Sequence, residues 1–322
     1  MTVDIRAVAG VVATMFLLML AGYTARKLRF IDDKSSKMMS DLIIRVGQPF
    51  MIIGAILGVP YSNDNLLKGG LILVIGIIIH AVAAVIAFIA TFKMRDAEER
   101  RLTEFSATFT NCGFLGLPLL RAAYGDVGAF WGAFFIIIFN LICWTYGIYV
   151  LSRASEKIKI NPLKIFVNFG TVPCVVGLVL YVARAGDVMP PVIFDAMHYL
   201  GSICTPLSML ITGGLLATIP LGKLFTNARI YILCAVKLLV LPVICGLVLA
   251  VLRFPYELTM FGTMMASLPT GTNAAIFAES YDIKPSYGAH AVGMTTLLSV
   301  LTIPTAVFAV DALIRFLGIY TI

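Results

Sequence analysis

The sequence predicts an all-α membrane protein of ten transmembrane helices, built as a 5+5 inverted repeat with crossed, broken helices 4 and 9. Three features of the chain predict this fold class. They are an apolar composition, an alternation of basic residues between successive loops, and prolines at corresponding places in the two halves of the chain.

The composition favours lipid as the main solvent. Of 322 residues, 60% are hydrophobic and only 13% are charged, and the mean hydropathy is +0.98. A soluble globular chain carries about 25% charged residues. The length fits one membrane domain over residues 1–322. The net charge of +7 indicates basic cytoplasmic loops and not nucleic-acid binding, because no basic helix or aromatic-basic sheet pattern accompanies it.

Apolar stretches long enough to cross a bilayer, about 20 residues each, recur along the whole chain. The predicted spans cover residues 5–26, 38–59, 68–92, 104–123, 128–151, 164–184, 192–219, 227–252, 257–280 and 287–317. The fourth and ninth are the least regular of the ten, because they are rich in Gly, Pro, Asn and Thr.

The first apolar stretch is predicted to be a transmembrane span and not a signal peptide. Its basic cluster, Arg26, Lys27 and Arg29, follows the apolar run, whereas a signal peptide carries its positive charge ahead of that run. The first span is therefore predicted to begin outside the cytoplasm.

Basic residues alternate between the two sides of the ten predicted spans. The loops that join spans 1–2, 3–4, 5–6, 7–8 and 9–10 hold sixteen Lys and Arg residues, and the opposite side holds six. Because short cytoplasmic loops are enriched in Lys and Arg, both termini are predicted to be extracytoplasmic. The expected location is the plasma (inner) membrane, in which the protein is multi-pass.

The chain divides into two five-span halves. Residues 1–152 form the first predicted repeat, residues 164–318 form the second, and residues 153–163 are a short cytoplasmic linker. An odd number of spans per half makes the second half enter the membrane in the opposite orientation. That is the inverted-repeat plan of many secondary transporters.

Prolines recur at corresponding places in the two halves. Pro49 interrupts predicted span 2 and Pro206 interrupts span 7, 157 residues later. Pro118 interrupts predicted span 4 and Pro269 interrupts span 9, at an offset of 151 residues. These matched interruptions support an internal repeat.

The segments around the second proline pair are the candidate binding site. Glycine and proline weaken a helix, and freed backbone groups cost several kcal/mol in hydrocarbon unless protein, water or a ligand satisfies them. Packing kinks are the alternative explanation, but breaks in both halves favour a site. The candidate substrate-binding residues are Asn111, Gly113, Pro118, Pro269, Gly271, Thr272 and Asn273.

Electrostatics indicate an anionic substrate. Half-helices that begin near the bilayer midplane present partly positive N-terminal ends, and Thr110 and Thr270 add neutral hydrogen-bonding groups. Ionisable residues inside spans are functional candidates, so Lys237, Arg45 and His80 are the coupling or charge-compensating candidates. Each has a structural alternative. Lys237 could bond to a backbone carbonyl or extend its charged end toward the membrane surface, Arg45 could bind carbonyls freed by Pro49, and His80 could simply fill space in the core.

The chain lacks the motifs of enzymes and cofactor proteins. Its three histidines have no metal-ligand spacing, and its six cysteines form no C-x-x-C pair. No nucleotide-binding glycine motif occurs. No enzyme activity, cofactor or metal site is therefore expected, and transport by this chain is not expected to be driven by ATP.

Four segments resemble the auxin efflux carrier family, which includes the plant PIN exporters and bacterial malonate or malate permeases. The stretch from Asn111 to Gly125, with Gly-Leu-Pro at its centre, is similar to the family's fourth-helix motif, and Ser267–Tyr281 is similar to its ninth. Lys237–Pro242 resembles the eighth helix, and Leu20–Tyr23 the first. The resemblance covers essentially the whole chain.

The resemblance implies spans 1, 2, 6 and 7 as a scaffold, and spans 3–5 and 8–10 as a moving transport domain. Asn111, Pro118, Pro269 and Asn273 would line the crossing that holds a carboxylate. Lys237 matches a basic residue that stands in for a coupling cation. A homodimer through the scaffold is expected by the same analogy. The short central linker fits a bacterial permease better than the long-looped plant exporters.

The expected function is that of a secondary transporter that moves a small organic anion across the bilayer. Mono- and dicarboxylates of the malonate, malate or auxin type all fit, and the sequence leaves open the direction and whether H+ or Na+ is coupled. Two alternatives are an uncoupled anion facilitator or channel, and a membrane receptor built on a transporter fold.

Overall fold

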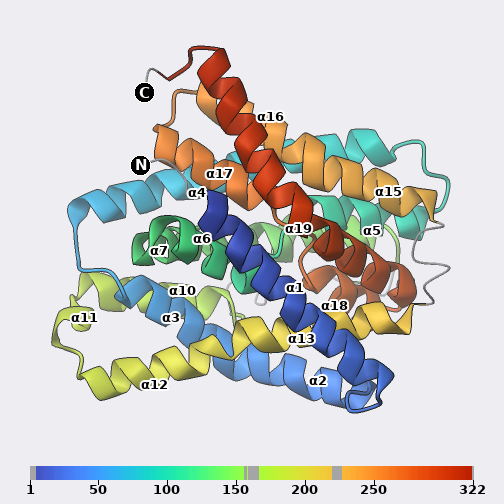
Figure 1. Cartoon of the computed structure of the whole chain (residues 1–322), viewed down its shortest axis with the longest axis horizontal. Helices are drawn as coiled ribbons and strands as arrows, with labels where there is room; N and C mark the ends of the chain where they lie inside the picture. Colours follow the sequence, from blue (N-terminus) through green and yellow to red (C-terminus); the bar gives the residue numbers. More distant parts are fainter. Residues whose placement is uncertain (1–4, 156–157, 159–166, 220–226, 321–322) are drawn as a thin grey trace.

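The structure is a computed structural model that describes residues 5–155, 158, 167–219 and 227–320 (Figure 1). All elements assigned in these residues are helices, which confirms the predicted all-α class. Seven helices are long and apolar enough to cross a membrane: Ala9–Lys27, Asp33–Leu57, Asn63–Thr91, Asp126–Ser152, Pro191–Thr218, Ala228–Val251 and Pro285–Phe316.

The other three predicted spans appear as shorter helices. Span 4 is divided into α5 (Ala97–Thr108) and a helix that runs from Cys112 to Tyr124, and span 9 into α17 (Tyr256–Ser267) and α18 (Asn273–Ser280). In span 6 the structure describes α10 (Thr171–Val182). The predicted start of that span and most of the predicted linker, residues 153–163, lie outside the described residues.

Several long helices contain a wider π-helical turn, written η. The remaining elements are α1 (Ile5–Lys27), α2 (Asp33–Leu42), η1 (Ile43–Gly47), α3 (Gln48–Leu57), α4 (Asn63–Thr91), η2 (Cys112–Gly116), α6 (Leu117–Tyr124), α7 (Asp126–Ile142), η3 (Cys143–Gly147), α8 (Ile148–Ser152), α11 (Ala185–Val188), α12 (Pro191–Ser202), α13 (Cys204–Thr218), α15 (Ala228–Ala235), η4 (Val236–Val240), α16 (Leu241–Val251) and α19 (Pro285–Phe316).

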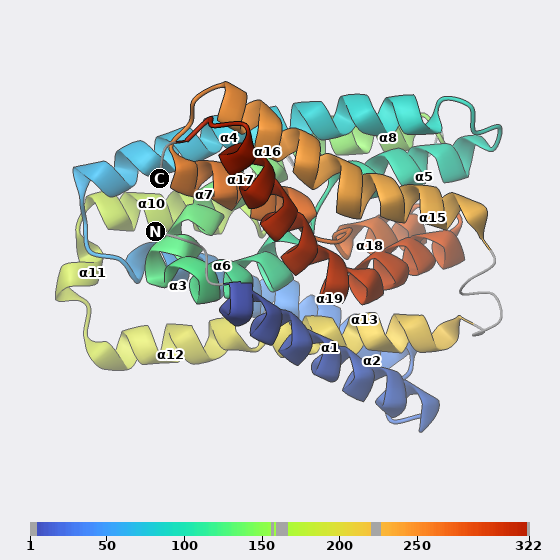
Figure 2. The ribbon, with the colours of Figure 1, turned by 45° about the horizontal axis from the view of Figure 1, so that its top comes forward.

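The helices fall into two groups that face each other. In both views α2, α3, α12 and α13 lie along one side of the molecule, and α4 and α16 lie along the other (Figures 1 and 2). α1 packs on α13, and α10 and α12 pack on α3. In the second group α4 packs on α7, and α16 and α19 pack on α17. The half-helices α6 and α18 lie between the two sides in both views.

Proline does not break the helices at residues 49 and 118, which corrects the prediction from the sequence. The helix runs through Pro118 from Cys112 to Tyr124, and a second runs through Pro49. In both places a π-helix ends two residues before the proline, at Gly116 and Gly47. A wider turn accommodates the missing N–H and moves away the carbonyl that the ring would otherwise meet. Only Pro269, of the second proline pair, lies in an actual break.

Large apolar side chains cover the outside of the molecule, as a lipid-embedded protein requires. On α10 five valines are exposed along a single short helix: Val172, Val175, Val176, Val179 and Val182. The exposed large apolar residues of α4 include Val74, Ile77, Val85, Phe88 and Ile89. An exposed apolar area of this extent is rare on a soluble monomer, so the surface agrees with a multi-pass membrane protein.

An ion cluster joins three loops on the predicted cytoplasmic side. Asp96, the N-cap of α5, and Glu99 both pair with Lys284, the N-cap of α19. Glu99 also pairs with Arg229, in the first turn of α15. The Lys284 ammonium lowers the pKa of Asp96 below its ordinary 3.8. Asp96 and Glu99 in turn raise the pKa of Lys284 above 10.5. The cluster therefore ties α5 of the first half to α15 and α19 of the second.

We predict that Lys284→Met lowers the melting temperature of the detergent-solubilised protein by about 1–4 °C at neutral pH, because a partly exposed pair contributes little. A carboxyl group whose pKa is lowered by folding stabilises the fold at pH values above its ordinary pKa. This stabilisation is lost as the pH falls below that value. An ammonium group whose pKa is raised by folding stabilises the fold at pH values below its ordinary pKa. This stabilisation is lost as the pH rises through the raised pKa. The difference in melting temperature between Lys284→Met and the unmodified protein should thus stay constant from about pH 5 to pH 9 and become smaller below about pH 4.

The matched control is Lys37→Met on α2, since Lys37 has no carboxylate partner among the described residues. It should leave the melting temperature unchanged. Equal effects of the two substitutions at neutral pH would show that the ion cluster contributes nothing to stability.

Candidate functional site

The two helix breaks lie directly against each other. α5 ends at Thr108 and α17 ends at Ser267, and each is followed by an extended residue, Phe109 or Leu268. Beyond these, Thr110 and Thr270 face each other as an antiparallel bridge. The Asn111 N–H donates to the Pro269 carbonyl at 2.9 Å, and the Gly271 N–H donates to the Phe109 carbonyl at 3.0 Å. We call this contact the crossing.

Gly271 is required at the crossing because the two backbones approach closely. A Cβ at this position would lie 2.9 Å from the Thr110 carbonyl oxygen and 3.2 Å from its carbon. The atoms that would be met belong to the backbone, so no side-chain movement can relieve the contact. Gly113 has room by comparison, with only the Met51 methyl nearby at 3.8 Å.

Three polar groups at the crossing are buried without a hydrogen-bond partner among the described residues. They are the Ser106 hydroxyl, the Thr110 hydroxyl and the Asn111 side-chain nitrogen Nδ2. Their neighbour Thr270 is fully engaged, because its hydroxyl donates to the Ser106 carbonyl and its N–H donates to the Thr295 hydroxyl. Buried polar groups in proteins are normally paired, so unpaired ones at a helix break mark a place where a ligand can bind.

Two half-helices begin at the crossing with uncapped N-termini. η2 follows its N-cap Asn111, and α18 begins at Asn273 after its N-cap Thr272. Neither N-cap side chain bonds to the backbone of its helix. The first N–H groups of a helix point away from it and carry a partial positive charge. Thr272 and Asn273 therefore lie beside one such end, and Asn111 beside the other.

The Lys237 side chain reaches from η4 to the C-terminal end of α5, the helix that leads into the crossing. Its side chain is 1% exposed, and its ammonium Nζ donates to the Ala107 carbonyl at 3.0 Å. Ala107 is in the last turn of α5, where carbonyls are unpaired and the helix dipole is negative. No carboxylate among the described residues pairs with Lys237. The charge is thus held by a helix end and not by a counter-ion.

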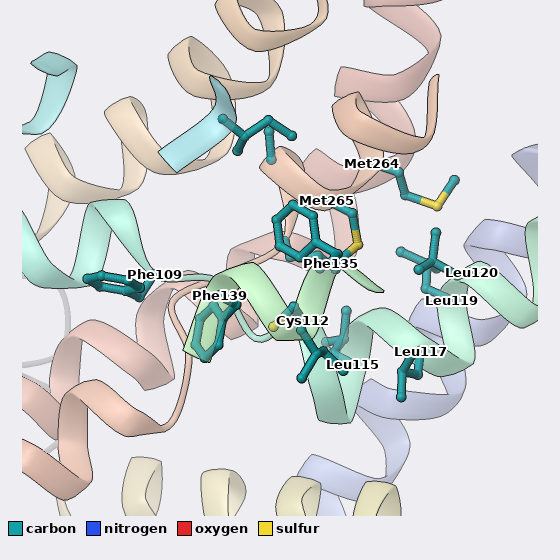
Figure 3. Packing of buried hydrophobic residues seen from close by; sticks show 14 of the residues in the cluster. Phe109, Cys112, Leu115, Leu117, Leu119, Leu120, Phe135, Phe139, Met264 and Met265 are labelled. Atoms are coloured by element: carbon teal, nitrogen blue, oxygen red, sulfur yellow. The ribbon is translucent and has the colours of Figure 1, made fainter. Parts of the chain in front are cut away.

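His80 lies beside the crossing and packs against three phenylalanine rings. Its ring centroid is 5.4 to 6.0 Å from those of Phe109, Phe135 and Phe139. Nδ1 lies 2.7 Å from the Gly76 carbonyl, so Nδ1 is the donor, and Nε2 has no partner among the described residues. Figure 3 shows Phe139 close to Cys112, at the start of η2, with Phe109 on the far side of Phe139. His80 therefore contacts the crossing through Phe109.

A cavity of about 770 Å³ lies between the two groups of helices. α3 and α12 form one wall, and α6 with the start of α7 forms the other. Pro118 lines this cavity and does not touch the crossing. Gly58 and Asp126, at the predicted extracytoplasmic ends of their spans, are among its lining residues. The cavity therefore opens toward that side.

The opposite end of the cavity is closed by contacts between the two helix groups. The Thr205 hydroxyl of α13 donates to the Phe114 carbonyl of η2 at 3.0 Å. The Phe114 side chain packs against a small buried cluster of Ile43, Cys204 and Ile211. These contacts lie on the predicted cytoplasmic side of the cavity and join the two helix groups there.

The structure brings most of the predicted site residues together, with three exceptions: Arg45, Pro118 and Gly113, which lies in η2 near the Met51 methyl. Asn111, Pro269, Gly271, Thr272 and Asn273 meet at the crossing, and Lys237 lies behind it. Arg45 does not belong to this group: its side chain is 65% exposed and its nearest carboxylate is that of Asp41, at 3.4 Å. Pro118 lines the cavity instead.

Sequence reasoning missed Ser106, Thr205 and Thr295. Each is one of many hydroxyl residues in apolar spans, and no motif distinguishes them. Their roles depend on partners far along the chain, since Ser106 binds Thr270 through its carbonyl and Thr205 binds Phe114. Among the described residues, no group of three His, Cys, Asp or Glu side chains is placed to hold a metal ion.

Comparison with known proteins identifies the family of this chain. The sequence model of the membrane transport protein family matches residues 7–307. The chain belongs to this family. The predicted resemblance to the auxin efflux carrier family is thereby confirmed.

Two curated members of the family are similar to the chain over nearly their whole length. A protein of Rhizobium meliloti (strain 1021) named "Putative malonate transporter" is 25% identical over 304 residues, which cover 92% of this chain and 93% of that protein. A protein of Methanothermobacter thermautotrophicus named "Uncharacterized transporter" is 23% identical over 294 residues, covering 91% and 95%.

We predict that Gly271→Ala destabilises the protein by about 1–3 kcal/mol, since the added methyl group must push two backbones apart. Thermal unfolding in detergent measures the effect as a lower melting temperature. Gly70→Ala is the control, because a Cβ at Gly70 in α4 meets nothing within 4 Å. Equal melting temperatures for the two variants would contradict the close approach at the crossing.

Proposed function

We propose that this protein is a secondary transporter that carries a small organic anion, a mono- or dicarboxylate, through the crossing of its fourth and ninth spans. The observation that carries the proposal is the crossing itself, where two helix breaks pair while three polar groups stay unpartnered. A channel or a receptor has no need of two half-helices held in register between a scaffold and a second group of helices.

The charges around the crossing favour an anion. Four helix ends meet there: the C-termini of α5 and α17, and the N-termini of η2 and α18. The partial charges of two positive and two negative ends roughly cancel. Lys237, in its protonated form, adds a positive charge on the side of α5, with no carboxylate partner among the described residues. An anion at the crossing therefore completes the charge balance, and a cation opposes it.

The hydrogen bonds that a carboxylate needs are also present. The Asn111 side-chain nitrogen and the Thr110 hydroxyl can donate, and both are without a partner among the described residues. The uncapped first N–H groups of η2 and α18 supply further donors. We place Asn273 as a second amide donor, at the first residue of α18.

The proposed architecture has ten spans in two inverted five-span repeats. The two short half-helix pairs count as spans 4 and 9, and α10 as part of span 6. In this proposal α1, α2, α3, α10, α12 and α13 form the scaffold, and the other group moves against it to expose the crossing alternately. The cavity on one side and the Thr205–Phe114 contact on the other support such a motion.

We propose that Lys237 and His80 compensate charge during transport, and that a proton or sodium gradient is the energy source. The exposed position of Arg45 gives it no role at the crossing. A homodimer through the scaffold accompanies the proposal. Because one similar protein is named for malonate, malonate is the first acid to test, followed by malate and an auxin.

The proposed orientation predicts which surface cysteines an impermeant maleimide can reach in intact cells. Cysteine at Val188, which is exposed at the end of α11, should be labelled from outside. Cysteine at Lys34, on α2, should be labelled only after the cells are made permeable. The six native cysteines are buried in the structure and give a low background. The reverse pattern would overturn the orientation.

We predict saturable uptake of labelled malonate, malate or a related acid by proteoliposomes. Asn111→Ala and Asn273→Ala should each raise the KM by about tenfold or more, because each removes an amide donor to a charged group in a dry site. Asn65→Ala, in the first turn of α4, is the control and should leave the KM unchanged. Imposed proton or sodium gradients then identify the coupling ion.

Lys237→Met tests the charge balance in the same assay. It should abolish uptake of the acid while the protein stays folded, since the crossing then lacks the positive charge that balances the substrate. Lys93→Met is the control and should transport normally. Absence of uptake of every acid by the unmodified protein would overturn the transport proposal. Normal uptake by Lys237→Met would overturn only the charge argument.

A further inference from the structure

One ion pair lines the cavity between the two helix groups and has no role in the transport proposed above. Arg121 and Asp126 lie on the wall formed by α6 and the start of α7, and the Arg121 Nε is 3.0 Å from an Asp126 carboxylate oxygen. Asp195 and His198, on α12, are the other ionisable residues of the lining. Arg121 is therefore the one lining side chain in the described structure that is cationic at every working pH.

Arg121 lies on the same side of α6 as Pro118, which also lines the cavity. It follows Pro118 by three residues on α6, and residues three apart share a helix face. Both line the cavity. Small residues around them leave space for a ligand, since Gly54, Gly58 and Ala122 are also in the lining.

The Arg121–Asp126 pair is suited to exchange of partners. The side chains are 45% and 62% exposed, so the pair itself is worth little. Arg121 has no other partner among the described residues. A guanidinium presents a planar fork that binds a carboxylate through two hydrogen bonds. A carboxylate ligand that enters the cavity can thus replace Asp126 at Arg121.

Asp126 remains stabilised when it gives up this partner. It is the first residue of α7, a helix of 17 residues. The partly positive N-terminal end of a helix stabilises a negative side chain in its first turn. The displaced carboxylate therefore keeps a favourable environment, which lowers the free energy needed for the exchange.

The three other arginines whose side chains are described at the predicted extracytoplasmic ends of spans do not line the cavity. Arg184 lies over the Tyr61 ring at 4.6 Å, and Arg253 donates to the Ile319 carbonyl at 2.8 Å. Arg315 pairs with Asp311 at 2.8 Å. Of the arginines described here, only Arg121 combines exposure to the cavity with an exchangeable partner.

We propose that Arg121 captures the substrate carboxylate in the cavity, with Asp126 as its resting counter-ion, before the acid reaches the crossing. This rests on the proposed function, because it assumes that an anion is carried through the crossing. Arg121 follows Asn111 by ten residues, about 15 Å at 1.5 Å per residue. A small diacid is shorter than this distance, so the capture site and the crossing are occupied in sequence and not together.

The experiment measures the KM and Vmax of labelled malonate uptake by intact cells that express Arg121→Gln or Asp126→Asn. Arg121→Gln should raise the KM about five- to tenfold, and Asp126→Asn should lower it about two- to fivefold, because it frees the guanidinium. Vmax should change little in both. Added salt should raise the KM of the unmodified protein and leave that of Arg121→Gln nearly unchanged.

Opposite shifts separate capture from a structural role. Loss of a merely structural ion pair would move both variants in the same direction, and that result, or an unchanged KM in both, overturns the proposal. Arg315→Gln and Asp311→Asn are the matched controls, since they break a comparable pair outside the cavity. If Arg121→Gln does not reach the membrane, Arg121→Lys, which keeps the charge and loses the fork, and Asp126→Asn decide. Absence of malonate uptake by the unmodified protein would instead count against the proposed substrate.

Discussion

The structure depends on two backbone hydrogen bonds between segments 160 residues apart, from Asn111 to Pro269 and from Gly271 to Phe109. A break in a membrane helix frees N–H and C=O groups that lipid cannot satisfy. Each break here satisfies part of the other, so neither half of the chain can complete its broken helix alone. The need to bring the two breaks together explains why Gly271 has no side chain, why α5 and α17 end where they do, and why the ion cluster of Asp96, Glu99 and Lys284 joins the two halves.

The second constraint is charge. Two helix C-termini point toward the crossing, and Lys237 donates to one of them at the Ala107 carbonyl. A buried ammonium is costly unless nearby groups offset the loss of water. One carbonyl, even at the negative end of a helix, offsets only part of that cost. The protein thus holds a positive charge in a place where an arriving anion improves its environment. The energetic cost of burying Lys237 is the physical basis for preferring an anion to a cation or a neutral solute.

The sequence predicts the chemistry of the site better than its geometry. The Gly- and Asn-rich segments at Asn111 and Gly271 identify the crossing because they weaken helices inside apolar runs, a local property. The effect of proline is not local: Pro118 and Pro49 each follow a π-helical turn and continue the helix, and only Pro269 lies in a break. Arg45 shows the same limit, because an arginine within a predicted span can still lie on the outer surface of the protein and pair with Asp41. Contacts such as Ser106 with Thr270 depend on folding distant segments together, which no spacing along the chain reveals.

The positions of the two cationic groups suggest an order of events for the substrate. Arg121 is half exposed and already has a carboxylate partner, whereas Lys237 is fully buried and has none among the described residues. Electrostatic attraction strengthens as water is excluded, but so does the cost of removing water from the anion. A group with an exchangeable partner holds the acid while it is still partly hydrated. A buried cationic group without a partner, such as Lys237, offsets the free energy needed to remove the remaining water from the anion. Reversing the two would place the strongest attraction at the cavity mouth, where an acid would bind without advancing to the crossing.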